Sequence, residues 1–247
     1  MKDMNPSEEY VFPKRGFKSK NRSLLAAMTN KQSHEDGTLS DEEITWLTRR
    51  AKDGFGIVTT AASHVSELGK GWIGEMGVWS DNQIEGLTKL ASSLKQHGSL
   101  NLVQIFHGGM KAPFEINNVI PVCPSKMMNE STGKLLARDL KTDEIHQLIE
   151  DFSDAAKRCE DAGFDGIEVH GAHSYLISQF LGSKTNRRTD EFGGSIENRF
   201  RFLREIILSI RKKTNDDFLV AVRISPKIST IGITLEDSIE VTKMLCE

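Results

Sequence analysis

Short apolar runs alternate with longer stretches of helical hydrophobic spacing along most of the chain. Each apolar run leads into a polar loop and then into a segment with one apolar helical face, and this order occurs five times. Such alternation predicts a parallel sheet whose strands are joined by right-handed helical crossovers. The predicted strands cover residues 24–28, 55–59, 100–106, 166–169 and 218–224.

Helix start signals support this division of the chain. Ser40 and Glu43 form a capping-box pattern, in which a hydroxyl and a carboxylate satisfy the first backbone N–H groups of a helix. Ser80 and Gln83 repeat the pattern before the second predicted helix. The other three helices are predicted to begin at 143–144, at Ser195 and at Thr234.

The order of the elements favours an α/β fold of the (β/α)8 TIM-barrel type. No GxGxxG motif follows the first predicted strand, which disfavours a doubly wound dinucleotide-binding sheet. The loops after the strands are enlarged, as in barrel enzymes. Because five units are fewer than eight, we expect the chain to cover about the first five βα units. We divide it into an N-terminal arm, residues 1–22, and a partial barrel without the last strands, residues 23–247.

Composition and charge indicate which binding partners and which cellular location to expect for the protein. The 247 residues carry a formal net charge of −3, which gives no reason to expect nucleic acid or a membrane surface as a partner. No run of eighteen apolar residues occurs, and the first ten residues are too polar for a secretory signal. Three scattered cysteines indicate no disulfide framework. We therefore expect a cytoplasmic protein.

Residues that can do chemistry gather after the fourth predicted strand. His170, His173 and Tyr175 lie within six residues at its carboxyl end, followed by a long polar loop. Barrel enzymes place their active sites at the carboxyl ends of their strands. The other predicted strand ends contribute Met28, Thr29, Ala61, Gln104, His107 and Arg223.

The nature of these residues leaves several interpretations open. No carboxylate pair suits glycoside hydrolysis, and no Ser or Cys nucleophile sits in an elbow motif. The two histidines could bind zinc with His107, or they could be structural. Tyr175 is either a packing aromatic or a proton donor. Gln104 and Arg223 interrupt apolar strands and need polar partners; Glu168 is one candidate partner for Arg223.

Five segments of the chain have a distinctive sequence. They are AAMTN at 26–30, DGTLSDEEI at 36–44, LVQIFHGG at 102–109, GFDGIEVHGAHSYLISQFL at 163–181 and TNRRTDEFGGSIENRFRF at 185–202. These segments resemble the Old Yellow Enzyme family of FMN-dependent reductases. The resemblance runs from about residue 21 to the end of the chain, and its last two segments are the most specific.

The resemblance implies a site and a reaction. The partial barrel becomes an FMN-binding oxidoreductase domain that takes hydride from NADH or NADPH and reduces activated C=C bonds of enone-like substrates. His170 and His173 are expected to hold the substrate carbonyl oxygen, and Tyr175 to donate the proton; no metal is expected. The residues expected to bind FMN are Met28, Thr29, Ala61, Gln104 and Arg223.

Departures from the family pattern leave a second interpretation open. Ala27 stands where the family usually has proline, Gly182-Ser183 replaces the usual Ser-Pro, and Phe192 replaces a common tyrosine. These changes affect the expected substrate preference more than the reaction. The family holds the FMN phosphate with loops after the last two strands, which this sequence does not reach. The alternative is therefore a non-catalytic fragment that binds flavin weakly or only with a partner. We also expect a homo-oligomer.

Overall fold

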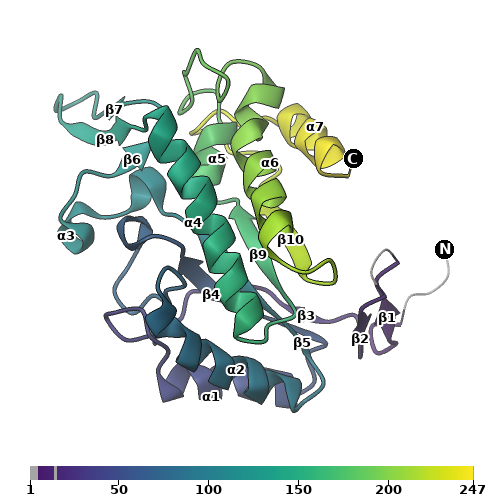
Figure 1. Cartoon of the computed structure of the whole chain (residues 1–247). Helices are drawn as coiled ribbons and strands as arrows, with labels where there is room; N and C mark the ends of the chain where they lie inside the picture. The colour runs from purple at the N-terminus through teal and green to yellow at the C-terminus, as the bar shows by residue number, and fades with distance from the viewer. Residues whose placement is uncertain (1–4, 14–15, 247) are drawn as a thin grey trace.

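A single parallel sheet forms the centre of the chain in a computed structural model, which describes residues 5–13 and 16–246. Its strand order is β10-β9-β5-β4-β3, and every neighbouring pair is parallel (Figure 1). The sheet curls like part of a barrel wall, which confirms the partial (β/α)8 fold. The strands are β3 Leu24–Leu25, β4 Ile57–His64, β5 Leu100–Phe106, β9 Gly166–Gly171 and β10 Leu219–Ile224.

The strand boundaries follow the apolar runs, with differences at the ends. The third predicted strand is β5, with the bounds that the apolar run predicts. Strand β4 continues to His64, so Ala61 lies inside a strand and not in the following loop. The first strand was predicted too long, because only Leu24 and Leu25 pair with β4. The central strand β5 is almost entirely buried, whereas all six residues of β10, at one edge, are half-buried.

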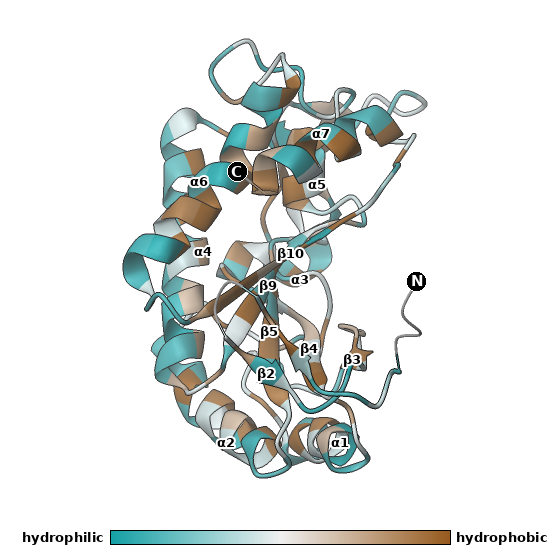
Figure 2. Cartoon of the chain, turned by 90° about the vertical axis from the view of Figure 1, so that its right-hand side faces the viewer, coloured by the Kyte–Doolittle hydropathy of each residue, from teal (hydrophilic) through white to brown (hydrophobic). Residues whose placement is uncertain are grey.

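Helices cover one side of this sheet. In Figure 2 helices α4 and α6 lie to the left of the strands, and α1 and α2 lie below them. The Ser40 and Ser195 hydroxyls accept backbone N–H bonds as expected, and Ser80 closes a capping box. The capping box predicted for Ser40 and Glu43 is only half formed, because the Glu43 carboxylate accepts from the Asn30 amide and the Ser33 hydroxyl instead. The five crossover helices are α1 Asp41–Lys52, α2 Ile84–Lys95, α4 Thr142–Asp161, α6 Ile196–Lys213 and α7 Leu235–Cys246.

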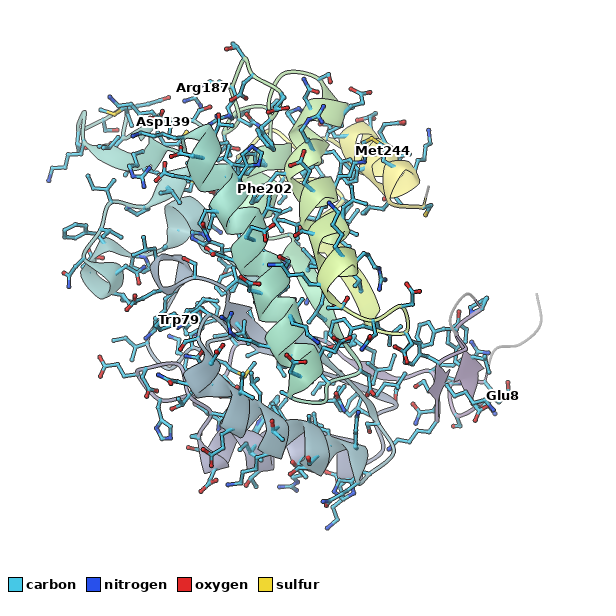
Figure 3. The ribbon with its side chains drawn as sticks, in the orientation of Figure 1. Glu8, Trp79, Asp139, Arg187, Phe202 and Met244 are labelled. Atoms are coloured by element: carbon cyan, nitrogen blue, oxygen red, sulfur yellow. The ribbon has the colours of Figure 1, made fainter. Side chains whose placement is uncertain are left out.

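Aromatic side chains fill the space between the long helices and the sheet. Phe202 projects from α6 towards α4 (Figure 3), where its ring meets Phe152 edge-on at 6.3 Å. The Phe202 ring also stacks on Phe180 at 4.2 Å. Phe180 belongs to a short helix, α5 Leu176–Leu181, which was not predicted and which lies in the polar loop after β9. This packing anchors that loop on a rigid support.

The excursion at residues 110–141 is a folded subdomain. It contains the helical turns η3 Gly109–Lys111 and α3 Phe114–Asn117 and a small three-stranded sheet of order β6-β8-β7. Arg188 joins it to the loop after β9, because its guanidinium donates to the carbonyls of Pro124 and Leu140 while pairing with Asp190. The small strands are β6 Val122–Cys123, β7 Met127–Met128 and β8 Leu135–Asp139.

The N-terminal arm contacts the opposite end of the sheet from the candidate site. It contains a hairpin, β1 Tyr10–Val11 with β2 Lys18–Ser19. Beyond the hairpin, the Lys20 ammonium donates to the carbonyls of Ala51 and His97 and so binds the carboxyl-terminal ends of α1 and α2. Within the described ranges, no helix combines the length and apolar character that crossing a membrane requires.

Candidate active site

The parallel register of the strands brings the candidate side chains to one edge of the sheet. Gln104 of β5 pairs with Glu168 of β9, and Arg223 of β10 pairs with His170 at the end of β9. Gln104, His170 and Arg223 belong to the carboxyl-terminal halves of neighbouring strands, and Glu168 lies near the middle of β9. The sequence prediction that these positions share one site edge is therefore consistent with the fold.

The two histidines predicted to hold a substrate oxygen face each other. His170 Nε2 and His173 Nδ1 lie 3.3 Å apart, and the ring centroids lie 5.0 Å apart. His170 is 3% exposed, and burial lowers its pKa to about 3. Burial also lowers the pKa of His173, and the positive charge of Arg223 adds to that effect. Both imidazoles are therefore neutral near pH 7 and can each donate one N–H bond.

A strained turn presents His173. His173 and Ser174 have φ values of 59° and 63°, a left-handed conformation that non-glycine residues avoid. Gln179, which is completely buried, donates to the Ser174 carbonyl at 2.8 Å and to the Gly108 carbonyl at 3.3 Å. Its side-chain oxygen accepts the Met110 N–H at 3.1 Å. One amide thus ties the strained turn to the loop after β5, which is the kind of support that strain at a functional site requires.

Tyr175 lies beside the histidine pair. Its ring centroid is 5.2 Å from that of His170 and 4.9 Å, edge-on, from that of Phe106. Burial raises the pKa of Tyr175 above its ordinary value, so its hydroxyl stays protonated near neutrality. The Lys111 ammonium lies 5.2 Å above the tyrosine ring and donates to the His173 carbonyl at 2.8 Å. A protonated phenol next to two neutral imidazoles can donate a proton.

Of the two polar residues inside the strands, Gln104 has a protein partner, and Arg223 is not paired with the carboxylate that was one candidate for it. Gln104 Nε2 donates to Glu168 Oε1 at 2.5 Å, so a protein carboxylate takes one of its amide hydrogens. Within residues 5–13 and 16–246, no ion pair joins Arg223 to Glu168, whose Oε1 accepts from Gln104. Arg223 is half-buried in the register position beside His170, and its positive charge adds to the effect of burial that lowers the pKa of His170.

Of the remaining residues predicted to bind the cofactor, one lies at a strand bulge and two lie in an exposed segment after a strand. Ala61 lies at a bulge in β4, where its carbonyl accepts bonds from the Thr60 and Ser63 hydroxyls at 2.8 and 3.1 Å. Bulges re-aim the backbone next to active sites. Met28 and Thr29 follow the short strand β3 and are exposed.

Sequence reasoning missed several residues that shape this edge. Lys111, Gln179 and Phe106 touch the histidine–tyrosine group, although no local pattern marks them. A second buried pair, His64 and Glu75, lies in the segment after the second predicted strand, which the sequence pattern assigns to a loop. Contact between distant segments created these features, so composition and spacing carried no signal for them.

The zinc interpretation finds no support in the geometry. His107 Nδ1 accepts the Gly109 N–H at 3.0 Å and belongs to the backbone turn after β5. Burial lowers the pKa of His107 to about 4. In the part of the chain that the structure describes, no group of three His, Cys, Asp or Glu side chains is arranged to hold a metal ion.

The side chains at the sheet edge suit a planar, polar cofactor. An amide, a guanidinium and a hydroxyl-bearing loop offer donors and acceptors, and a buried nitrogen, His170 Nδ1, lacks a partner among the described residues. The edge of a flavin ring, which needs both donors and acceptors, fits this set.

Comparison with known proteins decides the family. Residues 16–246 match the model of the NADH:flavin oxidoreductase / NADH oxidase family. The chain belongs to this family. Proteins of the family use FMN, with NADH or NADPH as electron donor, and the resemblance to the Old Yellow Enzyme family is confirmed.

Individual relatives agree with this assignment. A probable NADH-dependent flavin oxidoreductase of Bacillus subtilis is 38% identical over 95% of this chain and 65% of its own length. A 2-naphthoyl-CoA reductase complex superposes with a TM-score of 0.91 at 33% identity, over 97% of this chain and 38% of that chain. The Old Yellow Enzyme homologue from Zymomonas mobilis superposes with a TM-score of 0.87 at 29% identity, over 98% of this chain and 70% of that chain. These proteins are longer than this chain.

Proposed function

We propose that this chain carries the substrate-holding and proton-donating part of an FMN-dependent oxidoreductase that takes electrons from NADH or NADPH. Its acceptor is an electron-poor alkene such as an enone. The observation that carries this proposal is the juxtaposition of two neutral imidazoles, 3.3 Å apart, with a protonated tyrosine. Family membership supports the redox part of the proposal.

Five residues are proposed to hold FMN. Gln104 and Arg223 supply donors at the sheet edge, Ala61 supplies backbone at the β4 bulge, and Met28 and Thr29 supply the segment after β3. FMN, when bound and reduced by the nicotinamide, supplies the hydride for the β-carbon of the alkene.

The protein side chains complete the reduction. His170 and His173 donate hydrogen bonds to the acceptor's carbonyl oxygen, which gains negative charge as hydride adds to the conjugated system. Two neutral donors suit this role because they stabilise an oxyanion without transferring a proton to it prematurely. Tyr175 then donates its proton to the α-carbon, and solvent replaces that proton.

Replacement of Tyr175 by phenylalanine tests the proposal. The variant should bind FMN and accept electrons from NADH or NADPH at the normal rate, because the hydroxyl takes no part in either step. Reduction of 2-cyclohexenone by the reduced enzyme should slow by about 10²- to 10⁴-fold. Stopped-flow absorbance separates the two half-reactions. Loss of flavin from the variant, or a normal rate of alkene reduction, would remove Tyr175 from the proposed role.

The alternative is that this chain is a non-catalytic fragment. Absorbance of the purified chain with added FMN separates the two functions, because only a reductase binds the flavin and bleaches it with a nicotinamide. Sedimentation of the same sample tests the expected homo-oligomer.

A further inference from the structure

A buried pair joins His64, the last residue of β4, to Glu75 in the loop that follows. His64 Nδ1 and Glu75 Oε1 are 2.9 Å apart, and the two side chains are 2% and 0% exposed. Neither atom has another hydrogen-bond partner among the described residues. Two polar groups that are completely removed from water have to be satisfied by each other, so this contact fixes the position of Glu75 relative to the strand.

The second carboxyl oxygen of Glu75 reaches across the loop. Glu75 Oε2 accepts the backbone N–H of Gly71 at 2.8 Å and that of Trp72 at 3.2 Å. The base of the loop is closed by backbone bonds, since the His64 N–H donates to Met76 and the His64 carbonyl accepts from Val78. Glu75 therefore links the strand end to the backbone that carries Trp72.

Trp72 extends an aromatic series that begins at the candidate site. Its ring stacks on that of Phe106, with centroids 5.4 Å apart and planes inclined by 28°. Phe106 is 0% exposed and meets Tyr175 edge-on at 4.9 Å. Trp72 and Tyr175 are both half-buried and both contact the buried ring of Phe106, so Phe106 joins the indole to the tyrosine beside the histidine pair.

The pair that holds Trp72 is neutral. Burial raises the pKa of Glu75 well above its ordinary value and lowers the pKa of His64 to about 3. The proton therefore resides on Glu75, which donates it to His64 Nδ1. A glutamine can make the same contacts, because its amide N–H replaces the carboxyl O–H and its oxygen can still accept from Gly71 and Trp72.

We infer that Trp72 is a specificity-determining residue for flat, extended acceptors and that Glu75, held by His64, is its positioning residue. This inference rests on the proposed function, because it takes the histidine pair as the anchor of the acceptor's oxygen. A molecule anchored there with a single ring reaches Tyr175, whereas one with a second fused ring gains the indole surface of Trp72. Stacking of this kind strengthens binding by about three- to tenfold.

The test compares two phenols that bind through the same oxygen. Phenol has one ring and 2-naphthol has two, so the ratio of their Kd values isolates the contribution of the second ring. In Trp72→Leu the Kd of 2-naphthol should rise by about three- to tenfold while that of phenol changes less than about twofold. Trp46→Leu is the matched control, because it removes an indole that packs against Arg50 on α1. Titration calorimetry of the FMN-loaded chain gives both constants.

Glu75 is tested by two substitutions. Glu75→Gln should keep the wild-type ratio of the two Kd values, because it preserves the hydrogen bonds without a charge. Glu75→Ala should lower the preference for 2-naphthol as Trp72→Leu does, and its tryptophan emission should shift to the red as Trp72 loses its stacking partner. A glutamine variant that lost the preference would contradict the neutral pair, and an alanine variant that kept it would remove Glu75 from the positioning role.

The remaining outcomes separate this inference from the proposed function. An unchanged ratio in Trp72→Leu, or an equal loss for both phenols, would overturn the specificity role. If instead the ratio falls as expected but the loaded chain is not reduced by NADH or NADPH, the proposed reaction fails while the ligand-binding inference stands.

Discussion

Replacement of the two histidines of the site should lower ligand affinity in a non-additive way. In the free protein His170 Nε2 and His173 Nδ1 lie 3.3 Å apart, so one ring donates a hydrogen bond to the other. A ligand oxygen that binds between the rings gains two hydrogen bonds, but this mutual bond has to open first. Alanine at either position removes one ligand bond and also removes the need to open the mutual bond.

The magnitudes follow from ordinary hydrogen-bond energies. A bond to an anionic phenolate oxygen contributes about 2 kcal/mol, and a bond between two neutral imidazoles about 1 kcal/mol. Either single variant should therefore lose about 1 kcal/mol of binding free energy, a roughly fivefold rise in Kd. The double variant should lose about 3 kcal/mol, a roughly 150-fold rise. Its loss exceeds the sum of the single losses by about 1 kcal/mol, the strength of the mutual bond.

Titration calorimetry with 4-nitrophenol at mildly alkaline pH measures all four binding constants on FMN-loaded protein. Circular dichroism of each variant checks that the fold is retained. Additive losses would refute the mutual hydrogen bond, and unchanged binding in the double variant would show that the histidines are structural.

Three further predictions concern the rest of the site. Arg223→Gln should weaken FMN binding by about 10- to 100-fold, measured by quenching of flavin fluorescence, whereas the exposed Arg22→Gln should not. Burial lowers the pKa of His107 to about 4 and that of His170 to about 3, so both take up protons on unfolding. The free energy of unfolding should thus be highest above the ordinary histidine pKa and should decrease as the pH drops below it, by about 1.4 kcal/mol per pH unit for each imidazole, as measured by urea titration. In His107→Leu the free energy of unfolding should decrease less steeply with falling pH. Gln179→Leu leaves three backbone groups without their partner and should destabilise the chain by about 1–3 kcal/mol for each buried group, measured by urea unfolding; an unchanged midpoint would contradict its bridging role.

Much of the fold could be predicted because its signals are local. Strand β5 is a mostly apolar run, and the Ser40 and Ser195 caps lie where the helical spacing begins. These features depend on neighbouring residues alone. The short extent of β3 was not predictable in this way, because it depends on how far β4 offers it a partner.

The candidate site was predictable where one segment carries it. His170, His173 and Tyr175 share one strand end, so their proximity follows from the sequence. The partner of Gln104 is Glu168, sixty-four residues away, and a periodic pattern says nothing about such a contact. The same holds for Glu75, whose carboxyl group meets His64 across a loop. The left-handed turn at His173 also had no signal, because neither His173 nor Ser174 is a glycine.

The measurement that bears most directly on the proposed function is the absorbance spectrum of the purified chain with FMN. The account predicts a protein-bound flavin band that NADH or NADPH bleaches and that 2-cyclohexenone restores under anaerobic conditions. Absence of a bound-flavin band at saturating FMN would contradict it and would show that the residues of the site are present without the activity.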